Sequence, residues 1–275
     1  FASLTPDGKI LDKASTPTPE TLEDLLAWLD QRLSERDYRG IAMSVPGAVH
    51  QETGVIEGIS AIPYIHGFSW YEALAHHKLP VHLENDANCV GLSELLAHPE
   101  IENAACVVIG TGIGGAMIIN GKLHRGRHGL GGEFGYMTTI EPAEKLNNWS
   151  QLASTGNMVR YVIEKSGQSD WDGRKVYQEA VAGNALCQEA IERMNRNLAQ
   201  GLLNIQYLID PDVISLGGSI SQNPDFIKGV QKAVDAFVDR YEEYTIAPVI
   251  QACTYQADAN LYGALVNWLQ EENQW

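Results

Sequence analysis

The sequence predicts an α/β fold of two lobes, each with a mixed sheet that helices cover. Three observations lead to this prediction. Apolar runs typical of strands alternate with helix-like segments along most of the chain. Hairpin-like stretches open both halves, at residue 1 and again near residue 105. The chain has 275 residues, more than a usual single domain, so two compact units are expected.

The first half begins with a hairpin and continues with strand-helix units. The turn Pro6-Asp7-Gly8 separates two strand-like stretches. Leucines recur at helical spacing between residues 22 and 33, which predicts an amphipathic helix that starts near Thr21. Strands are expected at 1–4, 9–14, 41–45 and 81–84, and helices at 21–36, 68–77 and 87–97, the last capped by Asp86 or Asn85.

The second half opens with the most apolar strand of the chain, 105–111. A predicted turn at 112–114 makes this strand part of a second hairpin-like stretch. We expect further strands at 115–120, 122–123, 213–216 and 249–252, and helices at 157–165, 174–182, 185–208, 225–240 and 259–270. Because Pro99 ends a helix, the boundary between an N-terminal lobe (1–100) and a C-terminal lobe (101–258) is expected near this proline.

Charge and cysteine content exclude several classes of protein. The formal net charge is −16, whereas a protein that binds a phosphate backbone needs a cationic surface, so we expect no nucleic-acid partner. The cysteines form no CxxC motif and no short-range pair, which fits a reducing compartment better than a disulfide scaffold. They are Cys89, Cys106, Cys187 and Cys253.

No targeting or membrane segment is recognised. The longest uncharged run, 104–119, is interrupted by glycines and is shorter than the roughly 18 to 20 apolar residues of a spanning helix. The chain start lacks the basic and apolar regions of a signal peptide. We therefore expect a cytoplasmic protein without a membrane partner. The chain begins at Phe1 without Met and at once resembles a strand, so we also expect a preceding segment.

A glycine-rich segment follows the strand 105–111. Residues 110–115, Gly-Thr-Gly-Ile-Gly-Gly, satisfy the G-x-G-x-x-G pattern. A dinucleotide-binding fold requires a helix next, but residues 116–122 are typical of a strand and a turn. The segment is therefore predicted to be a hairpin tip whose N–H groups can approach phosphate oxygens, with Thr111 offering a hydroxyl. A tight turn without a ligand is the alternative.

Two carboxylates stand at positions suited to a binding site. Asp86 lies within Glu-Asn-Asp-Ala-Asn, at the end of a strand where ligands of open α/β folds bind, and Asn85 beside it can hydrogen-bond a polyol. The alternative is that Asp86 only caps a helix. Glu133 stands inside a run of glycines, 129–136, where it either binds a ligand or is simply solvated.

Five motifs, in this order and spacing, resemble the ROK family of sugar kinases and repressors. They are Val-Pro-Gly at 45–47, Glu-Asn-Asp-Ala-Asn at 84–88, Ile-Gly-Thr-Gly-Ile-Gly-Gly at 109–115, Gly-Gly-Glu-Phe-Gly at 131–135 and Leu-Gly-Gly at 216–218. The resemblance covers nearly the whole chain. It implies an actin-like (ribonuclease H-like, hexokinase-type) fold whose lobes close over a sugar and ATP, with the C-terminal helix 259–272 packed back on the first lobe.

The resemblance also implies roles for single residues. Asp86 is expected to be the general base that accepts the proton of the sugar 6-hydroxyl, while Mg²⁺ neutralises phosphate charge. The expected sugar-binding residues are Gly47, Asn85, Asp86 and Glu133. The expected ATP-binding residues are Thr111, Gly112 and Gly114 at the phosphates and Gly217 and Gly218 at the adenosine, although a plain strand-to-helix turn would also explain the last two.

Departures from the family pattern carry further expectations. Many members have an N-terminal Asp-Ile-Gly-Gly-Thr segment for phosphate and magnesium, which we expect in the segment before Phe1. Many also have a zinc site, but Tyr136 replaces its histidine and residues 138–150 contain no cysteine, so we expect no zinc and no metal-ligating residue. Ser150 or its neighbour replaces a glutamate that grips the sugar near C1 and C2, which permits a β-glucoside or a disaccharide.

Other polar and aromatic residues have two readings each. His66, Trp70 and Trp149 either stack on a sugar in a widened pocket or simply pack in the core. In the segment 124–128, His124 and His128 flank Arg125 and Arg127, and we interpret it as a polar loop rather than a metal or anion site.

Two functions of different class remain at this point. The first is an ATP-dependent kinase for glucose or a related hexose or glucoside; the second is a ROK-type sugar-sensing repressor or a catalytically silent sugar-binding protein. Repressors of the family carry a helix-turn-helix segment, usually basic, ahead of the fold, and none is present here. Asp86 favours catalysis, because a sensor needs no base. A homodimer is expected from the resemblance, and the sugar itself is not identified.

Overall fold

The computed structural model describes all residues except 59, 141–145, 242 and 244–245. The elements of the first half are β1 (Ala2–Leu4), β2 (Ile10–Lys13), α1 (Leu22–Leu33), β3 (Ile41–Val45), β4 (Ala48–His50), β5 (Val55–Glu57), α2 (Trp70–Leu74), β6 (Val81–Asn85) and α3 (Asp86–Ala97). The second half contains β7 (Ala104–Ile109), β8 (Ile113–Ile119), β9 (Lys122–Leu123), β10 (Thr138–Ile140), β11 (Leu146–Asn148), α4 (Trp149–Ala153), α5 (Thr155–Ser166), α6 (Gly173–Val181), α7 (Ala185–Ile209), β12 (Val213–Gly217), α8 (Pro224–Arg240), β13 (Ile250–Ala252) and α9 (Ala259–Glu271).

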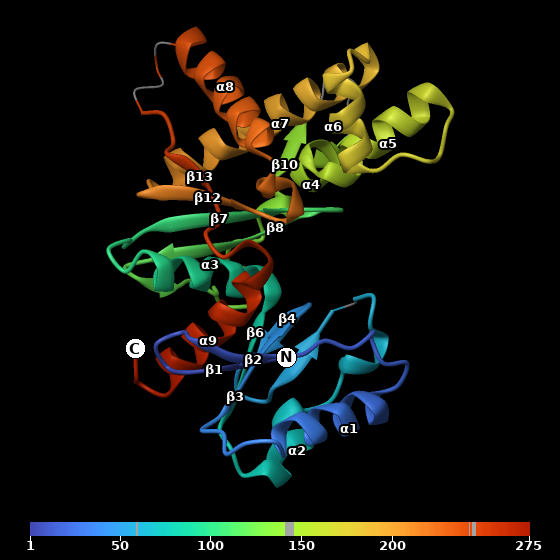
Figure 1. Ribbon diagram of the computed structural model, residues 1–275. Coiled ribbons are helices and arrows are strands. Elements are labelled where there is room, and N and C mark those ends of the chain that lie inside the picture. The colour runs from blue at the N-terminus through green and yellow to red at the C-terminus, as the bar shows by residue number, and fades with distance from the viewer. Residues whose placement is uncertain (59, 141–145, 242, 244–245) are drawn as a thin grey trace.

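A five-stranded mixed sheet organises the second half, in the order β13-β12-β7-β8-β9. Strand β12 is parallel to β13 and β7, whereas β8 is antiparallel to β7 and β9. Helices α7 and α8 lie on one side of this sheet, and α3 and α9 on the other (Figure 1). Helices on both sides explain why β7 is apolar along its whole length. The predicted α/β fold with mixed sheets flanked by helices is confirmed.

The first half contains three two-stranded sheets. Strands β3 and β6 are parallel, with Val45 opposite Asn85, so both strands end at the same edge. The antiparallel pairs are β1-β2 and β4-β5. Helix α1 covers this part with the predicted leucines, which pack partly buried around Ile41 and Leu83. The side chain of Thr21 caps α1 by accepting the N–H of Asp24, as the sequence indicates.

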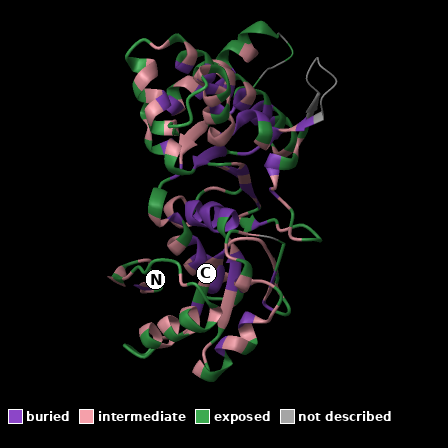
Figure 2. Ribbon diagram, turned by 90° about the vertical axis from the view of Figure 1, so that its right-hand side faces the viewer, coloured by how far each residue is buried: buried purple, intermediate pink, exposed green. Residues whose placement is uncertain are grey.

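The last helix, α9, crosses from the second half to the first. It packs against α3 and against β3 and β6 (Figure 1). Contact with α3 requires glycine at 263, because a Cβ there would lie 1.7 Å from the Cys89 carbonyl oxygen. Figure 2 shows that buried residues concentrate in the sheet and in the helices on both sides of it. Among the described helices, none is sufficiently long and apolar to span a bilayer.

The division into lobes 1–100 and 101–258 stays a prediction. Helix α3 belongs to the first range, yet it packs on β7 and β8 of the five-stranded sheet as well as on β6. Its buried side chains join those of α9 in an apolar cluster between the other two clusters of the protein.

One turn, one helix and four short strands differ from the predictions. The β7-β8 turn comprises residues 110–112 instead of 112–114, because the N–H of Gly110 donates to the Gly112 carbonyl at 2.9 Å and the chain reverses two residues earlier. The predicted helix 68–77 divides into α2 and a 3-10 turn, Ala75–His77. Strands β4, β5, β10 and β11 have three residues each, too few for a recognisable period, and the sequence does not predict them.

Candidate active site

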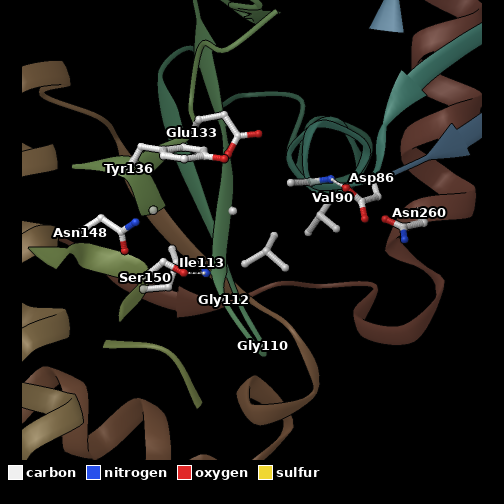
Figure 3. A pocket seen from close by; sticks show the side chains of 14 residues that line it. Asp86, Val90, Gly110, Gly112, Ile113, Glu133, Tyr136, Asn148, Ser150 and Asn260 are labelled. Carbon is white, nitrogen blue, oxygen red and sulfur yellow. Dashed lines mark hydrogen bonds between the residues drawn. The ribbon is translucent and has the colours of Figure 1, made fainter. Parts of the chain in front are cut away.

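A cavity of about 470 Å³ lies between the start of α3 and the β7-β8 turn. Figure 3 shows Asp86 and Asn260 on one side of it, Asn148 and Ser150 on the other, and Glu133 and Tyr136 along the rim. The lining residues are Asp86, Ala87, Val90, Val108, Gly110, Gly112, Ile113, Gly114, Glu133, Gly135, Tyr136, Asn148, Ser150 and Asn260. Elements that are distant in the sequence therefore build one cavity.

Asp86 is the first residue of α3, and its carboxylate points into the cavity. The helix is capped by Asn85 instead, whose Oδ1 accepts the N–H groups of Ala87 at 2.9 Å and Asn88 at 3.1 Å. The interpretation of Asp86 as a mere N-cap is therefore wrong. Loss of surrounding water raises the pKa of Asp86, and hydrogen bonds from the Ala87 N–H and from Asn85 offset only part of that effect. A carboxylate in this state is suited to accept a proton.

Glu133 lies half-buried at the start of the 3-10 turn Phe134–Tyr136. Burial raises the pKa of Glu133, and the negative charge of Asp86 raises it further. The charge of Asp86 therefore affects the protonation of Glu133 across the cavity (Figure 3).

The hairpin tip 110–112 forms the floor of the cavity in Figure 3. It is a turn between antiparallel strands, as predicted, and no helix follows it. A Cβ added at Gly110 would meet nothing within 4 Å, so the tip is open at this residue, whereas Ser150 lies against Gly112. Among the described residues, no acceptor takes the N–H of Thr111 or Gly112. These groups fit phosphate oxygens, which bind readily to successive free backbone N–H groups.

The other expected binding residues lie beside the cavity, outside its lining. The Nδ2 of Asn85 donates to the Gly47 carbonyl at 3.1 Å, which ties the β3-β4 turn to the start of α3. Gly47 has φ +100, and a Cβ there would lie 2.6 Å from the Glu57 carbonyl oxygen. Gly218, with φ +91, packs on the end of β7, where a Cβ would lie 2.1 Å from the Ile109 carbonyl oxygen. Gly217 and Thr111 likewise do not line the cavity.

A buried ion pair supports the corner between β6 and α3. Arg125 Nε donates to Glu84 Oε2 at 2.6 Å, and its Nη2 donates to Asn267 at 2.7 Å and to Glu271 at 3.1 Å. The other oxygen of Glu84 accepts the Asn85 N–H at 2.8 Å and the Nδ2 of Asn88 at 2.8 Å. The sequence predicts only that Arg125 lies in a polar loop. Its pairing with Glu84 leaves no local sequence pattern.

Three uncharged polar side chains form the part of the cavity farthest from Asp86 in Figure 3. Ser150 Oγ accepts the N–H of Ile113 at 2.9 Å, and Asn148 and Tyr136 lie beside it. Tyr136 is 72% exposed, so this end of the cavity opens to solvent. Among the lining residues, the only carboxylates are Asp86 and Glu133.

Sequence reasoning missed Asn148 and Asn260. Asn260 lies near the start of α9, and it reaches Asp86 only because α9 folds back across the sheet. The idea that Trp70 and Trp149 stack on a sugar is wrong, since both are 1% exposed and belong to the core. Their ring N–H groups donate to the carbonyls of Ile65 and Asn197. His66 is hydrogen-bonded to Ser60 and is not among the lining residues.

The chain matches a known protein family along almost its whole length. Residues 2–271 match the model of the ROK family. A beta-glucoside kinase from Listeria monocytogenes is 34% identical over 281 residues, which cover 98% of this chain and 94% of that protein.

Solved structures agree with this match. A ROK family protein from Streptococcus pneumoniae TIGR4, in complex with sucrose, is 88% identical, with a TM-score of 0.98 and coverage of 100% of this chain and 95% of that one. The ROK hexokinase from Thermus thermophilus is 26% identical, with a TM-score of 0.83 and coverage of 97% and 93%.

Proposed function

The chain belongs to the ROK family, and from this membership we propose that it is an ATP-dependent kinase for the 6-hydroxyl of a glucoside or a related hexose. One observation carries the proposal: the Asp86 carboxylate lines the same cavity as Gly110 and Gly112 of the tip 110–112 (Figure 3). A carboxylate can accept a hydroxyl proton, and free backbone N–H groups can bind phosphate. A hydroxyl activated beside a bound phosphate is what phosphoryl transfer requires, so this arrangement supports the proposal.

The chemistry assigned to the protein is mainly positioning. Asp86 orients the sugar 6-hydroxyl and accepts its proton while the oxygen attacks the γ-phosphorus of ATP. The bond from that phosphorus to the β-γ bridging oxygen breaks, and ADP leaves. Glu133, Asn85 and the backbone near Gly47 hydrogen-bond the ring hydroxyls in this proposal, which fits the hydrogen bond that joins Asn85 to Gly47.

We assign ATP to the side of the cavity formed by the glycine turns. Thr111, Gly112 and Gly114 contact the phosphates in this proposal, and Gly217 and Gly218 lie by the adenosine. Mg²⁺, when bound, neutralises charge on the phosphates. One oxygen of Asp86 could hold a water molecule of this ion while the other faces the sugar hydroxyl, which is compatible with its role as the base.

The preferred substrate class, we propose, carries a group at C1. β-Glucosides and sucrose, which the names of two relatives mention, each have a substituent at C1 of a glucosyl unit. With the 6-hydroxyl at Asp86, such a substituent extends toward Tyr136, Asn148 and Ser150. These side chains are uncharged and can hydrogen-bond sugar hydroxyls, and the cavity opens to solvent beside Tyr136.

A panel assay tests the substrate class. ADP release would be measured with magnesium and ATP on cellobiose, a methyl β-glucoside, sucrose, glucose, mannose and N-acetylmannosamine. We expect the highest kcat/KM on a sugar with a C1 substituent. Equal or higher values on free hexoses would contradict the assignment of the uncharged wall. Binding of a sugar without turnover on any of them would favour the sensor or the silent sugar-binding protein.

We also propose a homodimer, supported by an apolar surface on α7. Leu208 is 78% exposed, and a second hollow beside it is lined by Met137, Thr138, Leu203, Asn204 and Tyr207. Light scattering on the wild type and on Leu208→Glu tests this. We expect a dimer that the charge weakens, and a wild-type monomer would contradict the proposal.

A further inference from the structure

Two histidines and an aspartate converge on one point far from the cavity. Asp30 lies on α1, and His76 and His77 lie in the 3-10 turn Ala75–His77 that follows α2. The Nε2 atoms of His76 and His77 lie 3.0 and 2.7 Å from Asp30 Oδ1. Each residue thus directs one donor atom at the other two, and all these atoms lie within 4.8 Å of one another.

The distances between Asp30 Oδ1 and the two histidine nitrogens are close to the distances between neighbouring ligand atoms of a zinc site. Zinc binds histidine nitrogen at about 2.0 to 2.1 Å and carboxylate oxygen at about 2.0 to 2.2 Å, in tetrahedral geometry. Two ligands of such a tetrahedron are about 3.3 Å apart by the same bond lengths. The Asp30-His76 and Asp30-His77 separations, 3.0 and 2.7 Å, are shorter than this by about 0.3 and about 0.6 Å, so the side chains would rotate apart to admit an ion.

We propose that Asp30, His76 and His77 form a binding site for a divalent transition-metal ion, best matched by Zn²⁺. Imidazole nitrogen and carboxylate oxygen are ligands that zinc accepts. Water completes the coordination, because the side chains of His76 and Asp30 are 55% and 46% exposed. The proposal departs from the sequence-based expectation that the chain has no metal-ligating residue.

The site would connect two segments of the first half. The side chain of His77 is only 15% exposed, and the preceding helix α2 is anchored by Leu74, which is fully buried. Asp30 belongs to α1, which lies beside α2 at the end of the molecule remote from the cavity (Figure 1). A bound ion would therefore hold α1 against the 3-10 turn that follows α2 and stabilise the folded chain by mass action, without contacting the proposed catalytic residues.

Metal titration of the full chain, freed of metal with a chelator, tests the site. Zn²⁺ binding would be followed by calorimetry and Co²⁺ binding by visible absorption. We expect one equivalent of ion per chain and a Tm that rises with Zn²⁺ concentration. The cobalt spectrum should lack a sulfur-to-metal band, because no cysteine belongs to the site.

Three substitutions localise the ion. Asp30→Asn, His76→Ala and His77→Ala should each weaken binding at least tenfold and abolish the Tm rise. His98→Ala is the matched control: His98 also lies beside a carboxylate, Glu100 at 3.5 Å, but is in no three-donor group among the described residues. Circular dichroism confirms that each variant is folded, and exposed His76 is the substitution least prone to disturb the fold.

Two results would overturn the proposal. One is the absence of Zn²⁺ and Co²⁺ binding to the folded wild type, which would leave the three residues as a hydrogen-bonded cluster only. The other is binding that the three variants retain at wild-type strength, which would place the ion elsewhere.

Discussion

Arg125 Nε donates to Glu84 Oε2 at 2.6 Å, although Glu84 is only 2% exposed. Glu84 in turn accepts the backbone N–H of Asn85, next to Asp86. The carbonyl of Arg125 accepts the N–H of Gly131, two residues before Glu133. One buried carboxylate therefore connects the segment that carries Asp86 to the segment that carries Glu133.

We predict that Arg125→Gln destabilises the protein and slows phosphoryl transfer. Removal of one partner from a buried ion pair costs about 3 to 5 kcal/mol, and the low end applies because the Arg125 side chain is 27% exposed. Chemical denaturation and steady-state kinetics measure the two effects. The loss of kcat should exceed the loss of sugar affinity, because Glu84 orients the residues around Asp86.

Lys175→Gln is the matched control for this substitution. Lys175 forms a 2.6 Å ion pair with Asp170, but both side chains are substantially exposed, at 34% and 74%. The expected cost is about 0 to 1 kcal/mol, without a change in kcat. Equal destabilisation by the two substitutions would show that the Glu84 pair does not support the site.

A second prediction separates capping from catalysis at Asn85. Asn85→Ala removes a helix cap, which costs about 0.5 to 2 kcal/mol. It also removes the hydrogen bond that lowers the pKa of Asp86. The acid limb of kcat/KM should therefore move to higher pH.

Asn184→Ala removes an equivalent cap far from the cavity. Asn184 accepts the N–H groups of Leu186 at 3.1 Å and Cys187 at 3.3 Å, as Asn85 does at the start of α3. A similar loss of stability is expected, with an unchanged pH profile. The same pH shift in both variants would rule out a specific effect on Asp86.

A third prediction concerns pH. Asp86 must be ionised to accept a proton, and desolvation raises its pKa, so activity should fall as the pH drops through a value above the ordinary aspartate range of about 3.9. The free energy of unfolding should rise over the same fall in pH. A carboxyl with a raised folded-state pKa binds its proton more tightly in the folded chain, so its contribution to stability grows as the pH falls.

Asp86→Asn removes this titration. The variant should be more stable than the wild type at neutral pH, and the difference in Tm should narrow as the pH falls through the raised pKa of Asp86. A difference that is constant with pH would contradict the raised pKa.

A fourth prediction tests the uncharged wall. Ser150→Glu places a larger, charged side chain in the part of the cavity assigned to the C1 substituent, so at saturating ATP the KM for cellobiose should rise at least tenfold relative to the KM for glucose. Gln151→Glu adds the same charge one residue later, outside the lining residues, and a glutamate there retains the capping box with Asn148. Its KM ratio should stay at the wild-type value. If both substitutions change the ratio equally, the effect is one of charge and not of space.

The sequence predicts the alternation of strands and helices, because the leucines of 22–33 recur at helical spacing and continuous apolar runs such as 105–111 are bounded by turn residues. It also points to Asp86 and Glu133, since each stands in a motif whose position in the fold is recognisable. The contribution of Asn260 depends on α9 packing across the sheet, and the Arg125-Glu84 pair joins a loop to a strand. Such long-range contacts leave no local pattern. The proposed metal site also depends on a long-range contact: the sequence shows the adjacent His76 and His77, but it does not show that Asp30 lies beside them.

The most direct measurement of the central claim compares the wild type with Asp86→Asn at saturating ATP and magnesium. ADP release and sugar binding would be measured on the same preparations, and the phosphorylated carbon identified by nuclear magnetic resonance. We predict a 6-phosphate product and a loss of turnover of about 10² to 10⁴-fold in Asp86→Asn, with sugar binding retained. Wild-type turnover in Asp86→Asn, or a phosphate on another carbon, would contradict the assignment of Asp86 as the base.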